Sequence, residues 1–260
     1  MTITIQPVLA ANAAVYAIDN ATVEGKATVA VLFILSMFSW SIIITKFRQL
    51  MIARRATKNF LAVYGATRDP LDIQRKGESF AGAPAYELYI RGADELAYQL
   101  KNNPVIAKGE RRISKASFDA VKVVLEEAAG NQAMALEKGM IVLSTAVAGG
   151  PFIGLLGTVW GVMSTFAGIA ESKAATLTAM APGVAAALVA TVTGLLVAIP
   201  AMFAYNFMVT TIRHITQELD GYAARYANQI EHAYVDNRDI EDKITWALTK
   251  AEVGETTPAI

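Results

Sequence analysis

The stretch GLLGTVWGVMSTF, residues 154–166, decides the fold. It combines three glycines with three hydroxyl-bearing side chains, and it lies in a longer run, residues 139–170, that contains no charged side chain. An α-helix needs roughly 20 apolar residues to cross the hydrocarbon core of a bilayer. A run of this length is too long for the core helix of a water-soluble protein, so the sequence predicts a membrane-spanning helix.

Two further uncharged runs give the chain its fold class. The chain has 260 residues, 54% of them hydrophobic, and its 23 basic and 23 acidic side chains are spread unevenly. The additional uncharged runs are residues 27–45 and residues 174–212, and each is long enough to span. We therefore expect an all-α membrane protein with three transmembrane helices, at 27–45, 139–170 and 174–206. A tight hairpin at residues 171–173 is expected to join the second span to the third.

The distribution of basic side chains predicts the orientation. Residues 46–138 hold sixteen Lys and Arg and residues 213–260 hold five, whereas only Lys26 and Lys173 lie on the other side. Loops rich in Lys and Arg stay in the cytoplasm. The N-terminal segment, 1–26, is therefore expected outside the membrane on the periplasmic side, and the C-terminus is expected in the cytoplasm.

The cytoplasmic region, 46–138, is expected to extend the spans as helices. One helix is predicted over residues 84–101, and another from about Ser114 that continues into the second span without a break. The polar, glycine-bearing stretch between Gly65 and Pro84 predicts a linker or loop, in which Asp69 caps a short turn. No strand is predicted in this region.

The C-terminal region, 207–260, begins with a helix that has an apolar seam at spacings of 4 and 3 residues, typical of helix packing. The seam is formed by Met208, Ile212, Ile215, Leu219, Tyr222 and Tyr226. It has two possible partners, the helix leading into the second span and a neighbouring subunit.

The two ends of the chain are expected to differ. The N-terminal end is expected to contain a short interfacial helix beginning near Pro7, without a cleaved signal peptide. The tail beyond about Lys250 is expected to be disordered.

Small residues at four-residue spacing predict close contacts between the second and third spans. Such pairs let helix backbones approach each other in lipid, where apolar surface alone gives no preference for a protein neighbour. The glycines concerned are Gly154, Gly157 and Gly161 in the second span and Gly183 and Gly194 in the third.

Thr158 and Thr191 lie near the middle of these two spans, so antiparallel neighbours would bring them to similar depth. A threonine in a span often only bonds a carbonyl of its own helix. Each one alone is therefore weak evidence for a polar path.

Two segments of these spans resemble a known family. GPFIGLLGTVWGVMSTFAGIA, residues 150–170, followed by APGVAAALVATVTGLLVAIPAMFAYN, residues 181–206, is similar to the double signature of the MotA/TolQ/ExbB proton channel family, in its ExbB and TolQ branch. The three-span topology and the cytoplasmic insert also fit this family.

The resemblance implies a function as a motor or stator subunit in the bacterial inner membrane. Such proteins form a ring, a homopentamer in the family, around the span of a partner of the ExbD/TolR type, and ion flow drives an envelope effector such as a TonB-like or TolA-like protein. Carried over by position, the pore threonines of the family are Thr158 and Thr191. No cofactor is implied beyond the transported ion, and the expected partners are membrane lipids and protein subunits, not nucleic acid.

The sequence departs from the family at Ala186, where the ExbB and TolQ branch usually has a glutamate. The three spans contain no Asp, Glu, His or Lys, so this chain alone has no side chain in a span that titrates as a proton relay. We therefore expect an Asp on the partner to supply the carboxylate. A proton is the first candidate for the coupled ion and sodium the second, because hydroxyl and carbonyl oxygens suit that hard cation.

The sequence allows two alternatives to the ion-driven motor. One is a membrane scaffold that has lost conduction together with the family glutamate. The other is a membrane enzyme, which is disfavoured because the chain contains no GxSxG, HExxH, phosphate loop or cysteine. We therefore expect a protein that is not an enzyme and has no metal or catalytic site.

Overall fold

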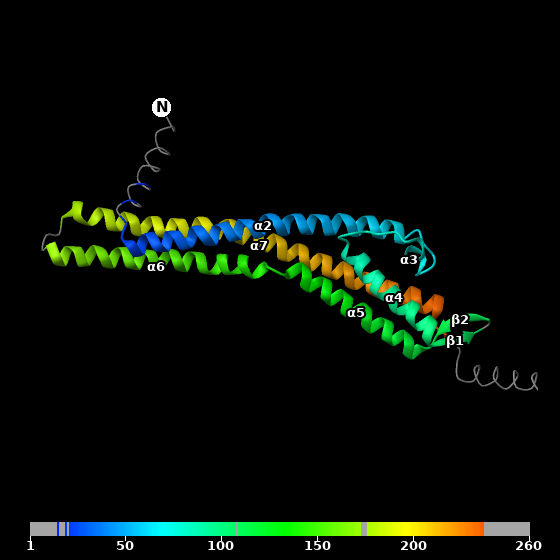
Figure 1. Cartoon of the computed structure of the whole chain (residues 1–260). Helices are drawn as coiled ribbons and strands as arrows, with labels where there is room; N and C mark the ends of the chain where they lie inside the picture. Colours follow the sequence, from blue (N-terminus) through cyan, green and yellow to red (C-terminus); the bar gives the residue numbers. More distant parts are fainter. Residues whose placement is uncertain (1–14, 16–18, 20, 108, 173–175, 237–260) are drawn as a thin grey trace, which may run out of the picture. The chain divides into compact units, whose positions relative to one another are not determined.

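The computed structural model describes residues 15, 19, 21–107, 109–172 and 176–236, and these are mostly helical (Figure 1). Three of the helices are long and apolar enough to cross a membrane, which confirms the all-α membrane fold. The helices are α2 (Val23–Tyr64), α3 (Asp72–Lys76), α4 (Pro84–Asn102), α5 (Lys115–Glu137), α6 (Met140–Ser172) and α7 (Leu177–Tyr234). The expected helix near Pro7, Lys173 of the expected hairpin and the expected disordered tail lie outside the described residues.

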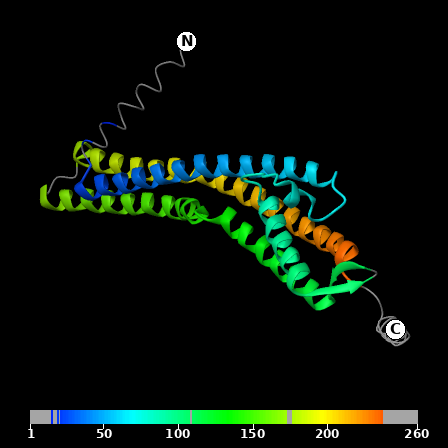
Figure 2. The same cartoon turned by 45° about the vertical axis from the view of Figure 1, so that its right-hand side comes forward.

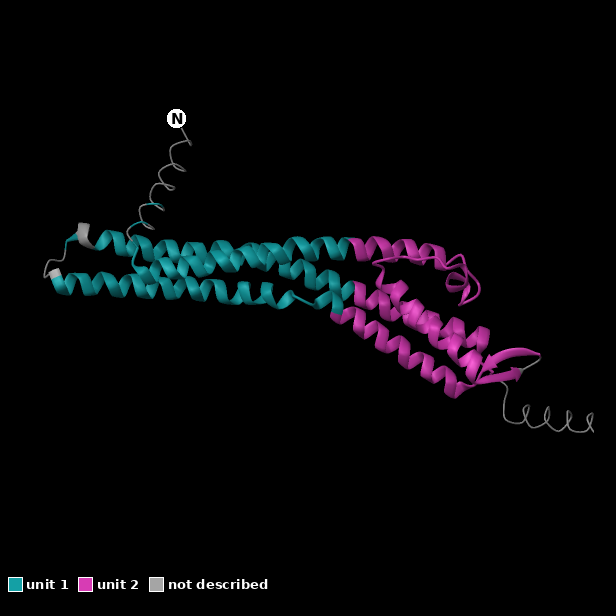
Figure 3. Cartoon of the chain, viewed as in Figure 1, with its two compact units in different colours: residues 1–51, 135–214 teal, residues 52–134, 215–260 magenta. Residues whose placement is uncertain are grey.

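The chain divides into two compact units, coloured separately in Figure 3. Unit 1 consists of residues 1–51 and 135–214 and contains the three uncharged runs apart from the masked residues. Unit 2 consists of residues 52–134 and 215–260. The helices α2, α5 and α7 each contribute residues to both units.

Unit 1 is a three-helix arrangement in which α2, α6 and α7 lie side by side, as Figures 1 and 2 both show. Its interior contains small side chains, among them the buried Ala187, Ala190 and Ala201, whereas large aromatic side chains such as Phe152 and Phe203 are exposed. This distribution is typical of membrane helices, because small residues allow close packing and lipid solvates the large apolar ones.

Unit 2 has an aromatic core. Phe60 of α2 is fully buried, and its ring lies 5.6 Å from that of Tyr222 and 5.7 Å from that of Tyr89. The ring of Tyr226 lies 5.2 Å from that of Tyr89 on α4. This part of the α7 seam therefore packs within the chain against α2 and α4. Gly92 of α4 lies against Tyr226 of the seam and against Leu125 of α5, the helix that was expected as the partner.

A short β-hairpin corrects one prediction for the cytoplasmic region. The strand β1 (Pro104–Ala107) pairs antiparallel with β2 (Glu110–Ile113), and Gly109 between them has φ +83°. A proline cannot continue the helix that precedes it, and a glycine with positive φ is the usual residue for a tight hairpin turn. The prediction that the region contains no strand was wrong, because strands of four residues are too short to show an alternating pattern.

A break between α5 and α6 corrects a second prediction. The two helices are separated at Gly139, which has φ +89°, a conformation that glycine adopts readily. The side chain of Lys46 on α2 is buried beside this break and donates hydrogen bonds to the carbonyl oxygens of Leu136 (3.0 Å) and Ala135 (3.4 Å). The helix predicted from Ser114 is present, but its uninterrupted continuation into the second span was wrong.

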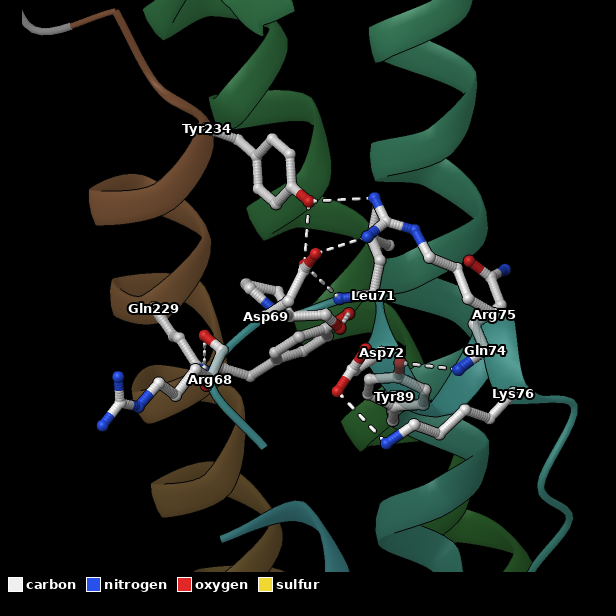
Figure 4. Close-up of polar contacts among 12 residues, drawn as sticks. Arg68, Asp69, Leu71, Asp72, Gln74, Arg75, Lys76, Tyr89, Gln229 and Tyr234 are labelled. Carbon is white, nitrogen blue, oxygen red and sulfur yellow. Dashed lines mark hydrogen bonds and ion pairs between the residues drawn. The ribbon is translucent and has the colours of Figure 1, made fainter. Parts of the chain in front are cut away.

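The loop after α2 is held by Asp69, as Figure 4 shows. The carboxylate of Asp69 accepts hydrogen bonds from the backbone N–H of Leu71 (2.9 Å) and the hydroxyl of Tyr234 (2.8 Å), and it forms an ion pair with Arg75. Partial desolvation opposes ionisation, but these donors and the guanidinium prevail and hold the pKa of Asp69 below its ordinary value. The expected short turn after Asp69 is present and leads into α3.

Candidate functional site

The backbones of α6 and α7 touch at the centre of unit 1. A methyl group built on Gly154 would lie 3.0 Å from the carbonyl oxygen of Ala190 and 3.1 Å from Cα of Thr191. On the other helix, a methyl group on Gly194 would lie 2.6 Å from the carbonyl oxygen of Gly150. Only glycine fits at these two positions without a shift of the neighbouring backbone.

The contact continues through Gly157 and Gly161, one and two helical turns further along α6. A methyl group on Gly157 would lie 2.6 Å from Cβ of Ala190 and 3.0 Å from the hydroxyl oxygen of Thr28 on α2. At Gly161 it would lie 2.8 Å from Cβ of Ala187. Three helices therefore meet at Gly157, and α6 and α7 run antiparallel along the glycine row.

The two threonines singled out by the sequence lie beside this glycine row. Thr191 is half-buried, and its hydroxyl donates a hydrogen bond across the contact to the carbonyl oxygen of Gly154, at 3.3 Å. Thr158 is also half-buried, but its hydroxyl donates to the carbonyl oxygen of Leu155 in its own helix, at 2.6 Å. Because Gly157 lies opposite Ala190, the two threonines occupy the same level of unit 1.

Two buried threonines at the same contact were not among the predicted site residues. Thr165 on α6 donates to the carbonyl oxygen of Gly161 at 2.8 Å and lies against Gly183, where a methyl group would come within 2.1 Å of its hydroxyl oxygen. Thr28 on α2 donates to the carbonyl oxygen of Gly25 at 2.8 Å and lies against Gly157. Both threonines are buried in unit 1. The only signal in the sequence was a hydroxyl within an uncharged run.

Ala186, the position of the missing family glutamate, lies elsewhere on α7. It lines a pocket together with residues of α2, whereas its neighbours Ala187 and Ala190 face α6. Residues 186 and 191 are five positions apart, which places them about 140° apart around a helix of 3.6 residues per turn. The glycine row and the pocket are therefore on different sides of α7.

The chemistry available at the α6–α7 contact consists of hydroxyl groups and backbone carbonyls. No group of three or more His, Cys, Asp or Glu side chains that could hold a metal ion occurs among the described residues. Hydroxyl groups do not titrate near neutral pH, but they order water and provide oxygen ligands for a hard cation. The contact therefore offers neutral oxygen ligands, and its described residues include no carboxylate.

Comparison with known proteins identifies relatives over most of the chain. The sequence model of the MotA/TolQ/ExbB proton channel family matches residues 98–221, which include all of α5 and α6. The Tol-Pal system protein TolQ of Haemophilus influenzae is 29% identical over 207 residues, covering 78% of this chain and 87% of the relative. The biopolymer transport protein ExbB of Xanthomonas campestris is 30% identical over 193 residues, covering 74% and 76%. The TolQ protein of Pseudomonas aeruginosa is 30% identical over 191 residues, covering 73% and 80%.

Proposed function

This chain belongs to the MotA/TolQ/ExbB proton channel family, and from this membership we propose that it conducts ions as a stator-type subunit that energises an envelope process. Its family is one of membrane channels and transport-associated motor subunits, not of enzymes. The proposed conduction takes place at the interface with a single-span partner, where Thr158 and Thr191 would line the path; both lie beside the α6–α7 contact, in which the hydroxyl of Thr191 donates to the Gly154 carbonyl. This uncharged, hydroxyl-lined contact is the observation on which the proposal depends.

The proposed partner is a single-span subunit of the ExbD/TolR type that supplies an Asp. Support comes from the absence of any Asp, Glu, His or Lys in the three uncharged runs, including Ala186 where the branch usually has a glutamate. A carboxylate buried in a membrane is the usual proton relay, because its pKa responds strongly to burial and to its neighbours. The proton is the proposed ion, and sodium is the alternative because the contact offers neutral oxygen ligands.

The proposed setting is the bacterial inner membrane, with the N-terminus in the periplasm and the C-terminus in the cytoplasm. The concentration of sixteen basic residues in 46–138 supports this orientation. We propose a homo-oligomeric ring, a pentamer by analogy with the family. In a ring, the faces of α6 and α7 that are exposed in one chain would meet the partner span and neighbouring copies. The driven effector would be a TonB-like or TolA-like protein.

The proposal is tested by removing the hydroxyls without changing side-chain shape. Thr158→Val and Thr191→Val are compared with Thr193→Val, a control whose hydroxyl only donates to the carbonyl of Val189 in its own helix, at 2.8 Å. In proteoliposomes containing this chain and its single-span partner, we expect Thr158→Val and Thr191→Val to reduce gradient-driven ion flux at least tenfold while the subunits still copurify. Flux equal to that of the control in both variants would refute the assignment.

A second candidate function is a non-conducting scaffold with the same fold, and the alanine at position 186 is the observation that favours it. The two functions make different demands on the partner. A partner whose span contains an Asp near its start supports the channel, whereas a partner span without any acid supports the scaffold.

A further inference from the structure

We propose that the pocket between α2 and α7 is a binding site for one membrane glycerophospholipid, with an acyl chain in the pocket and the lipid phosphate at Lys26. The pocket has a volume of about 270 Å³ and is lined mainly by residues of α2 and α7 in unit 1. This site is distinct from the α6–α7 contact, and the inference does not depend on ion conduction.

The shape of the pocket results from small side chains. Its lining includes Gly25 and Ala30 on α2 and Ala186 on α7, while Phe33 and Val189 add larger apolar walls. A cavity of about 150 Å³ is enough to take up a molecule the size of benzene. The larger pocket therefore has room for a segment of an acyl chain, and a longer side chain at position 186 would fill it.

The charge at the pocket selects the class of ligand. Within the part of the chain that the structure describes, Lys26 is the only charged residue in the lining, and the run that follows it, residues 27–45, is uncharged. Glu24 is exposed and does not line the pocket. Lys26 therefore marks one boundary of the span, where phosphate groups of a bilayer lie, and its ammonium can donate to them.

The depth of the pocket matches the acyl-chain region of the leaflet whose phosphates lie at the level of Lys26. From Lys26 to Phe33 the helix rises by about 10 Å. The apolar walls of the pocket therefore lie at the depth of the acyl chain of a lipid whose phosphate is at Lys26. Among the described residues, the ammonium donates one hydrogen bond, to the carbonyl oxygen of Asp19 at 3.1 Å. A lysine ammonium has three donors, so two are left for phosphate oxygens.

The exposed wall of the pocket is consistent with a lipid rather than a soluble ligand. Phe33 is 65% exposed and lies in the uncharged run of α2, on a surface that would face the bilayer. A water-soluble ligand would have to cross this surface. A lipid reaches the pocket by lateral diffusion.

The binding test uses two photoreactive probes in phosphatidylcholine vesicles containing the full chain. The first is phosphatidylglycerol with a diazirine on one acyl chain, and the second is diacylglycerol with the same chains but no phosphate. After illumination, mass spectrometry locates the labelled residues. We expect labelling around Phe33, Ala186 and Val189, stronger for the phospholipid by about fivefold, in line with the contribution of one basic residue near a lipid phosphate.

Substitutions at two positions test the phosphate contact and the binding of the acyl chain in the pocket separately. Lys26→Gln should reduce labelling by the phospholipid to the level of diacylglycerol, and Lys26→Arg should preserve the difference. Ala186→Leu should abolish labelling of the pocket by both probes. The control Ala167→Leu changes an exposed alanine of α6 outside the pocket and should have no effect on this labelling.

Three results would overturn the proposal. Equal labelling by the two probes in the unaltered chain would exclude recognition of the phosphate. Unchanged labelling in a folded Ala186→Leu variant would mean that the probes sample bulk lipid and not the pocket. A photoreactive residue introduced at position 33 that captures a second copy of the chain would identify the pocket as part of an interface between copies.

Discussion

The hydroxyl of Thr191 donates a hydrogen bond to the carbonyl oxygen of Gly154 on the neighbouring helix, at 3.3 Å. The missing side chain of Gly154 favours this bond, since a methyl group there would lie 3.1 Å from Cα of Thr191 and would require the helices to move apart slightly. The glycine and the threonine thus depend on each other. The glycine brings the backbones together, and the threonine places a hydroxyl in the contact that results.

The glycine contact leads to a stability prediction for Gly157→Ala. The added methyl group would lie 2.6 Å from Cβ of Ala190, so the helices must shift. We expect a loss of about 1–3 kcal/mol of stability, the usual cost of overpacking. The measurement is thermal unfolding of the purified protein in detergent.

Gly168→Ala is the matched control, because no side chain or other helix among the described residues comes within 4 Å of a methyl group built there. Replacing an exposed helical glycine by alanine is neutral or stabilises by up to about 1 kcal/mol. Equal destabilisation by the two substitutions would show that the close contact at Gly157 is not what limits stability.

The buried ammonium of Lys46 leads to a second prediction. Lys46→Met keeps an unbranched side chain but removes the donor to the carbonyl oxygens of Leu136 and Ala135. We expect a loss of about 1.5–3 kcal/mol, the range for hydrogen bonds to a charged group. Hydrogen exchange should quicken in the residues around Gly139.

The control for Lys46→Met is Lys58→Met, which changes an exposed lysine of the same helix. It should leave both the unfolding temperature and the exchange rates around Gly139 unchanged. If both variants behave alike, the ammonium of Lys46 does not stabilise the end of α5.

The loop held by Asp69 leads to a prediction about pH. The pKa of Asp69 is lower in the folded chain than its ordinary value of about 3.9, so the folded state favours the ionised carboxylate. Its stabilisation is complete above the unfolded pKa and is lost as the pH falls through the folded pKa. The difference in melting temperature between the unaltered chain and Asp69→Asn should therefore shrink on acidification below about pH 4.

A second substitution tests the cause of this pKa shift. Tyr234→Phe removes a hydroxyl that donates to Asp69 at 2.8 Å, so the folded-state pKa of Asp69 should rise toward its ordinary value. The acid-induced loss should then be smaller and should be complete at a higher pH. A melting-temperature difference that is independent of pH would be inconsistent with an ionised Asp69 acting as the loop's acceptor.

Much of the fold could be predicted because membrane spans leave a strong signal. Long uncharged runs identified the three apolar helices, and the seam from Met208 to Tyr226 identified buried positions of α7. The hairpin at 104–113 and the break at Gly139 were missed for a different reason. Each depends on a few residues, and a glycine within a helical pattern does not reveal its φ angle.

The candidate site could be predicted only in part. The glycine spacing pointed to the α6–α7 contact, but it could not separate Thr158 from Thr165 or draw attention to Thr28. Every helical threonine can bond a carbonyl three or four residues earlier, as Thr158, Thr165 and Thr28 all do. What distinguishes the buried pair is contact with Gly157 and Gly183 on other helices, which the sequence does not encode locally.

We propose that the hydroxyls of this chain shape an ion path and that an Asp of its partner supplies the titratable acid. The most direct measurement is proton flux in proteoliposomes under an imposed proton gradient, repeated with a sodium gradient and sodium flux. Three samples are compared, namely this chain alone, the chain with its single-span partner, and the chain with a partner whose Asp is replaced by Asn.

We expect proton flux only in the second sample. Sodium flux without proton flux in that sample would mean that the conducted ion is sodium, while the proposed path between the two subunits would stand. Proton flux through this chain alone, or equal flux with the Asp→Asn partner, would show that the partner's Asp is not the proton carrier.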